Sequence, residues 1–154
     1  MSAYADLLIR VRAGLMDTSA AVWHSTELDE ALRQALADMS LAAGATYSLT
    51  GLDGALITSL PAQYFANLVR GAAGYAVLWR AIERLDAFSL RPYLSSAALA
   101  AATALLTRFE MGLSHLAALR TVEMQTAAVP PYPTGTEPTP SGWTMPDDLS
   151  SGGG

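Results

Sequence analysis

The chain has 154 residues, of which 51% are hydrophobic and 15% charged, with a formal net charge of −5 and no cysteine. This length suits one domain with a substantial core. The fraction of charged residues is low for the surface of a soluble monomer, which indicates that copies of the chain or other partners cover part of that surface. The negative charge argues against wrapping nucleic acid by phosphate neutralisation, and the lack of cysteine excludes disulfides, thiol chemistry and cysteine-bound metal.

The N-terminal stretch predicts a short amphipathic helix. Ser2 can cap this helix, and Gly14 is a suitable end point directly after Ala13. Arg10 and Arg12 are expected to lie outside its apolar face. The apolar face has helical spacing and consists of Tyr4, Leu7, Leu8 and Val11.

A second, strongly amphipathic helix is predicted between residues 22 and 40, after a connector of small and polar residues. Trp23 and Leu28 have the spacing of a hydrophobic staple if residue 24 is the N-cap, and a glutamate then occupies the third helical position. His24 is a poor cap, so Ser25 is the alternative. We interpret the polar face of this helix as a solvated surface that carries Asp29, Glu30, Arg33 and Asp38.

The segment from residue 46 to residue 60 predicts a small two-stranded β-hairpin. Asp53-Gly54 is a typical two-residue type I′ turn, and Leu56-Ile57 are strand-forming residues that follow it. An isolated hairpin is only marginally stable in water. We therefore expect it to pack on the helices or to pair with a neighbouring subunit.

A third helix is predicted from Pro61 to Phe88, and it is apolar on nearly all sides. Only Arg70 is charged in the stretch between residues 69 and 79. Gly71 and Gly74 share one face, and each costs about 1 kcal/mol of helix stability relative to alanine. We expect the close approach of another backbone to compensate, which makes this helix the hub of the fold.

The longest helix is predicted from about residue 93 to residue 123 and begins at Pro92. At 1.5 Å per residue it would span about 45 Å, more than a small bundle needs, so we expect one end to project. Its apolar stripe consists of Leu99, Ala102, Leu106, Phe109, Leu113, Leu116 and Leu119. Together, these elements predict a mainly α fold: a bundle of about four helices in a domain of residues 1–124, with one β-hairpin.

The remaining residues, 125–154, form a tail rich in proline, glycine and serine that has no basic residue. Because it has no periodic apolar pattern, this tail alone is expected to be extended. One interpretation is a solvated tail. The other is a docking segment whose partner-binding anchors are Tyr132, Trp143 and Met145.

The sequence predicts no catalytic, cofactor or metal site. His24 and His115 belong to no Glu-x-x-His pair, and neither a nucleophile motif nor a phosphate-binding loop is present. Arg80, Glu83 and Arg84 have the helical spacing of a surface ion pair. No stretch reaches the roughly 18 uncharged apolar residues of a membrane helix. We therefore expect neither an enzyme nor a membrane-spanning chain.

Two blocks of the sequence stand out together. The first is W-x3-E-L-x3-L-x2-A-L-x-D-M, from Trp23 to Met39, and the second is GLDGALITSLP followed by LVRGAAGYAVLWRAIERLD, between Gly51 and Asp86. With the long Leu/Phe helix that follows, they resemble the head-to-tail adaptor (connector, or head-completion) proteins of tailed bacteriophages. The resemblance covers roughly residues 4–120. His24 departs from it, because the family usually has Ser, Thr or Asp there.

The resemblance implies a structural role in the virion neck, between head and tail, after assembly in the host cytoplasm. Such proteins form homo-oligomeric rings, usually of twelve copies, that bind the portal protein and present a surface to the tail or a stopper protein. DNA passes through their channel without specific binding, and they carry neither catalytic residues nor cofactors. The alternative is a small helical scaffolding or regulatory module that binds a protein partner through its Pro-rich tail.

Overall fold

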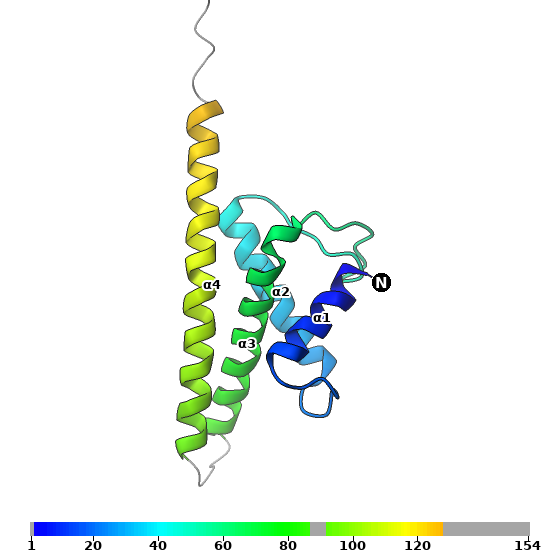
Figure 1. Cartoon of the computed structure of the whole chain (residues 1–154), viewed down its shortest axis with the longest axis vertical. Coiled ribbons are helices and arrows are strands. Elements are labelled where there is room, and N and C mark those ends of the chain that lie inside the picture. The colour runs from blue at the N-terminus through cyan, green and yellow to red at the C-terminus, as the bar shows by residue number, and fades with distance from the viewer. Residues whose placement is uncertain (1, 87–91, 128–154) are drawn as a thin grey trace, which may run out of the picture.

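The computed structural model describes residues 2–86 and 92–127. In chain order they form α1 (Ala3–Gly14), α2 (Ser25–Ala43), the short 3-10 helix η1 (Ala62–Tyr64), α3 (Phe65–Asp86) and α4 (Pro92–Ala127). The four α-helices pack into one bundle (Figure 1). The predicted mainly α, four-helix fold is therefore confirmed.

α3 is the central helix, because it packs against each of the other three α-helices. Pro61 lies at the N-cap of η1, and α3 continues from that turn at Phe65. The helix thus begins four residues after the proline rather than at it. Most of the buried residues of α3 are alanines, whose small side chains let the neighbouring helices approach closely. The buried residues are Leu68, Ala72, Ala73, Ala76 and Ala81.

Gly71 and Gly74 lie on the face of α3 that meets α4. A Cβ atom added to Gly71 would come within 2.7 Å of the Phe109 ring, and one added to Gly74 would come within 2.9 Å of Leu106. Both distances are shorter than van der Waals contact. We expected another backbone at this face, but the space is filled by two large side chains of α4.

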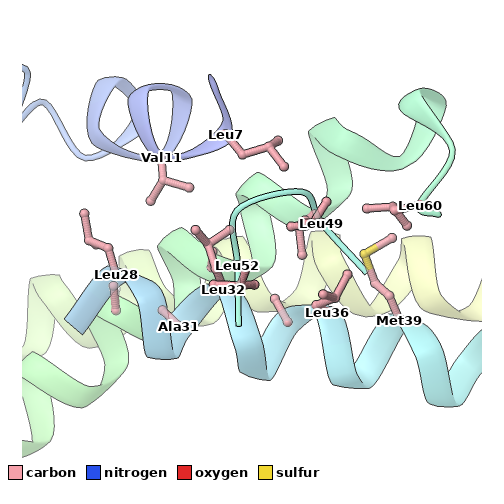
Figure 2. Packing of buried hydrophobic residues seen from close by; sticks show 14 of the residues in the cluster. Leu7, Val11, Leu28, Ala31, Leu32, Leu36, Met39, Leu49, Leu52 and Leu60 are labelled. Atoms are coloured by element: carbon pink, nitrogen blue, oxygen red, sulfur yellow. The ribbon is translucent and has the colours of Figure 1, made fainter. Parts of the chain in front are cut away.

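The core lies between the four α-helices and the loop that joins α2 to η1, and α4 contributes Phe109 and Leu116 to it. Figure 2 shows Leu7 and Val11 of α1 on the opposite side of the core from α2, with Leu49, Leu52 and Leu60 of the loop among them. The three loop leucines are at most 5% exposed. The loop is therefore anchored by apolar side chains. The apolar stripe of α2 is buried as predicted and consists of Leu28, Ala31, Leu32, Ala35, Leu36 and Met39.

The predicted β-hairpin is wrong, because the described residues contain no strand and 45–61 is a loop. Asp53 and Gly54 do form a tight turn, in which the φ angles are 51° and 75°. Both positive values are what a type I′ turn requires. The Ala55 N–H closes the turn by donating to the Leu52 carbonyl at 3.0 Å. The turn forms without the two strands.

Serine and threonine side chains replace the strand ladder on either side of this turn. The Thr50 N–H donates to the Thr58 hydroxyl at 2.9 Å, and the Ser48 N–H donates to the Ser59 hydroxyl at 2.8 Å. These hydroxyls compete for the backbone N–H groups with the carbonyl groups that would accept them in a β-sheet. The loop also joins α1, because the Tyr4 N–H donates to the Thr50 carbonyl.

α2 starts and ends at recognisable caps. His24 is the N-cap, and its N–H donates to the Glu27 carboxylate at 3.0 Å. Trp23 and Leu28 are both buried in the core cluster, in agreement with the predicted hydrophobic staple. The alternative cap one residue later is therefore wrong. Gly44 ends the helix in the left-handed region, with φ 64°.

α4 has 36 residues: it begins at Pro92, as predicted, and ends at Ala127, four residues past the predicted end. It is about 54 Å long at 1.5 Å per residue. Its C-terminal part projects past the other helices (Figure 1). Of its residues with described side chains, only Ala102, Phe109 and Leu116 are buried, at a spacing of seven. The predicted tail anchors Tyr132, Trp143 and Met145 lie outside the described residues.

Candidate functional site

A buried ion pair organises the loop between α1 and α2. Asp17 is 2% exposed, and its carboxylate accepts hydrogen bonds from the N–H groups of Ala21, Val22 and Trp23. Arg12 donates to the same carboxylate at 3.1 Å and to the Trp23 carbonyl at 3.0 Å. Burial alone would raise the pKa of Asp17, but the three N–H groups and Arg12 hold that pKa below its ordinary value. Arg12 is largely buried, yet its partners are polar atoms beside the apolar face of α1 rather than members of that face.

Arg80 packs on an aromatic ring. Its guanidinium carbon lies 4.4 Å from the centre of the Trp23 ring, a cation–π contact between α3 and the residue that precedes the N-cap of α2. The predicted ion pair with Glu83 is absent from the salt bridges of the described residues. Both Arg12 and Arg80 therefore stabilise the packing around Trp23.

Two carboxylates of the polar face of α2 are bonded to tyrosines. The Tyr4 hydroxyl of α1 donates to Asp29, and the Tyr75 hydroxyl of α3 donates to Asp38. Burial, followed by the hydrogen bond to Asp29, raises the pKa of Tyr4 to about 12, and the pKa of Tyr75 is raised for the same kinds of reason. The interpretation of this face as wholly solvated is wrong. The rest of the face is exposed: Arg33 pairs with Glu30 of the same helix and with Asp53 of the loop that follows.

These polar groups hold neighbouring elements of the bundle together. Each of them bonds to a neighbouring helix or loop. Residues 2–86 and 92–127 contain no cluster of three histidine or acidic residues that could hold a metal ion. His24 is exposed at the start of α2, whereas His115 lines a cleft between α3 and α4. None of the described helices combines the length and hydropathy needed to cross a membrane.

An unpartnered surface runs along α4, and we call it the outer α4 face. It lies on the side of the helix opposite the buried stripe, because at 100° per residue its positions fall about half a turn away. All its residues are uncharged and exposed, and most are small. Met111, in its middle, is 68% exposed. The outer α4 face consists of Ala97, Ala100, Ala104, Thr107, Met111, Ser114 and Ala118.

A groove follows the contact between α2 and the C-terminal half of α4, and we call it the α2–α4 groove. It consists of two clefts of about 390 Å³ and 400 Å³ that share Ala42. Leu41 and Met124 line it and are 80% and 57% exposed. Glu110 and Arg120 line its two compartments. The remaining lining residues are Asp38, Tyr75, Leu106, Phe109, Leu113, Ala117, Thr121 and Gln125.

A third cleft, of about 410 Å³, lies between α3 and α4. Arg70 and His115 line it, and none of its lining residues is acidic. Asn67 fills its floor: a Cβ atom at Gly112 would meet the Asn67 side chain, which donates to the Phe109 carbonyl at 3.5 Å. Three open clefts therefore flank α4, two toward α2 and one toward α3.

The comparisons with known proteins leave these surfaces unassigned: no family model, no curated protein and no solved structure matches this chain.

The sequence patterns locate some of these features and miss others. Trp23, Leu28, Gly71 and Gly74 all lie in the core as packing residues. The bonds of Asp17 are missed, because its partners are backbone N–H groups of a loop. The signal for the outer α4 face is present in the sequence, since the stretch from residue 92 to residue 107 has no charged residue.

Proposed function

We propose that this chain is a structural subunit of a tailed-bacteriophage virion, in which about twelve copies form a ring between the portal protein and the tail or a stopper protein. The observation that carries the proposal is the outer α4 face, an uncharged strip about 32 Å long on a helix whose opposite side is buried. Small residues at heptad spacing let a neighbouring element approach closely. A ring subunit buries such a strip, whereas a monomer leaves it in water.

A ring requires two different surfaces on each subunit, because each copy contacts one neighbour on either side. The second surface is the tip of the loop after α2. Leu56 and Ile57 are 90% and 72% exposed there. The loop lies on the side of the bundle away from α4 (Figure 1). We therefore place Leu56 and Ile57 of one copy against the outer α4 face of the next.

The charge distribution supports a channel through which DNA moves without specific binding. Three arginines are paired with acidic residues, namely Arg10, Arg12 and Arg33. With a formal net charge of −5, the chain lacks the excess of basic groups that would hold phosphates. The ring would occupy the virion neck after assembly in the host cytoplasm. The groups that hold the subunit together are structural, and no catalytic role is assigned to them.

The test measures particle mass, alone and after mixing with the portal protein, for wild type and two variants. Met111→Glu places a charge in the outer α4 face. Met16→Glu places the same charge on the α1–α2 connector, where the side chain is 95% exposed and outside both contact surfaces. We expect wild type and Met16→Glu to form rings and Met111→Glu to stay monomeric, because a buried unpaired charge opposes association.

Equal association of the two variants would exclude the outer α4 face as the ring contact. A wild-type chain that stays monomeric and adds no layer to the portal would overturn the adaptor function. If that monomer instead bound a protein partner and lost it on deletion of residues 129–154, the scaffolding or regulatory module would be the better account.

A further inference from the structure

The α2–α4 groove offers an apolar surface that the bundle itself leaves uncovered. Leu41 belongs to α2 yet is 80% exposed, and Met124 faces the same groove from α4. The compartments, about 390 Å³ and 400 Å³, are within the range of roughly 300–1,000 Å³ in which protein pockets take ligands. The two compartments are neighbours along α4, because both include Ala42. The occupant of the groove should be a narrow, extended segment with apolar side chains.

The charges along the groove restrict the occupant further. Asp38 is already satisfied, since it accepts hydrogen bonds from Tyr75 and from Gln34. Arg120 forms no ion pair with any residue that the structure describes, and its guanidinium lies against Gly44 at the C-terminal end of α2. An acidic group of the occupant is therefore expected near Arg120. Glu110 in the other compartment disfavours acidic groups there.

We infer that the α2–α4 groove binds the C-terminal tail, residues 128–154, of a second copy of this chain. The tail has the matching chemistry: Trp143 and Met145 are apolar, Asp147 and Asp148 follow them, and there is no basic residue. Its prolines lower the cost of ordering an extended segment. This inference rests on the proposed association of copies and names the segment that links one copy to the next.

The length of the groove matches the length of the tail segment that carries the apolar and acidic residues. Glu110 and Arg120 are ten residues apart on α4 and therefore about 15 Å apart along its axis. Trp143 and Asp148 are five positions apart and are therefore separated by about 16 Å in a polyproline-type extended conformation, at 3.1 Å per residue. With the Trp143 ring in the compartment beside Leu41, the carboxylate of Asp148 reaches Arg120. The tail then runs parallel to α4.

The end of α4 favours the groove of another copy over the tail's own groove. α4 continues to Ala127, and its C-terminal part points away from the bundle (Figure 1). The next residues include Pro130-Pro131, and a residue before proline favours extended backbone. To reach the groove of its own chain, the tail would have to reverse direction directly after α4, where the sequence has two consecutive prolines. To reach the groove of a neighbouring copy, the tail can continue in the direction of α4.

Disulfide trapping tests the inference with the full chain, which has no cysteine of its own. One variant carries Leu41→Cys in the groove and a second carries Thr144→Cys in the tail, and the two are mixed and oxidised. Because each chain has one thiol, a groove–tail link can form only between chains. The control replaces Leu41→Cys by Met16→Cys, which lies on the loop between α1 and α2, is 95% exposed and is outside both proposed contact surfaces. We expect the groove pair to cross-link at least tenfold faster.

A charge exchange provides the second measurement. Arg120→Glu should slow the cross-link at least fivefold, and Asp148→Arg in the tail partner should restore it. Equal rates for groove and loop pairs, or a charge exchange without rescue, would overturn the inference.

The double variant Leu41→Cys with Thr144→Cys separates the remaining outcomes. A monomeric product with an internal disulfide would place the tail in its own groove and would also overturn the inference. Rings that assemble without preferential cross-linking would contradict the tail site while leaving the proposed function intact. A chain that neither associates nor cross-links would contradict both.

Discussion

Gly71→Ala tests how tightly α3 and α4 are packed. The new methyl group would lie 2.7–2.9 Å from three carbon atoms of the Phe109 ring. That ring is 1% exposed and meets the Tyr75 ring edge-on, with centroids 6.2 Å apart, so any shift of the ring would disturb this contact. Overpacking of this kind costs about 1–3 kcal/mol. The gain in helix propensity from glycine to alanine is about 1 kcal/mol.

The two effects oppose each other, and we expect overpacking to win, with a free energy of unfolding about 1 kcal/mol lower than wild type. The assay is urea unfolding followed by circular dichroism, at a concentration where the chain is monomeric. Gly14→Ala is the matched control, since a Cβ atom there meets nothing within 4 Å. That variant should be as stable as wild type or slightly more stable.

A double variant separates packing from propensity. In Gly71→Ala with Phe109→Leu, the smaller side chain makes room for the methyl group, so the two changes should destabilise less than the sum of the single variants. If Gly71→Ala alone proved more stable than wild type, the tight contact with Phe109 would be refuted.

The remaining predictions concern the buried polar bonds. Asp17→Asn should lower the melting temperature at pH 7, because the amide cannot accept all the bonds that the carboxylate accepts. Since the pKa of Asp17 is depressed by folding, its contribution is present above the ordinary pKa of about 4 and is lost as the pH falls further. The gap in melting temperature between wild type and Asp17→Asn should therefore narrow below about pH 4, and a constant gap would contradict the bonding described. For Tyr4, whose pKa rises from 10 to about 12, the sign is opposite: its contribution is present below pH 10 and is lost as the pH rises through about 12. Tyr4→Phe should cost about 1 kcal/mol at neutral pH and reduce the alkaline loss of stability, as measured by urea unfolding between pH 7 and pH 12.

Helical periodicity predicted most of the fold because the helices bury regular stripes. The stripe of α2 follows the 3.6-residue period from Leu28 to Met39, and all its members are buried. End signals worked for the same local reason: Ser2 caps α1, and Gly44 ends α2 with a positive φ. The proline signal predicts the start of α3 four residues too early, because Pro61 precedes a 3-10 turn.

The loop after α2 shows where local patterns fail. Asp53-Gly54 was correctly located as a turn, but strand formation depends on which groups bond to the flanking N–H groups. Here the hydroxyls of Thr58 and Ser59 accept hydrogen bonds from those N–H groups. An alternating pattern of apolar and polar residues does not reveal which acceptor an N–H group will use. The three buried leucines of the loop then fix it to the core, without a sheet.

The long-range polar bonds were also beyond local patterns. The bond from Tyr75 to Asp38 joins residues 37 positions apart, and the bond from Tyr4 to Asp29 joins residues 25 apart. A carboxylate on the polar side of a helix gives no signal for such a partner. The outer α4 face differs, since its lack of charge is visible in the sequence and only its exposure required the structure.

The most direct test of the proposed function is electron microscopy of the full chain mixed with the portal protein, together with the particle mass of the complex. The account predicts a closed ring of about twelve copies added as one layer to the portal, and no added layer with Met111→Glu. Portal particles that gain neither mass nor a layer from the wild-type chain would contradict it.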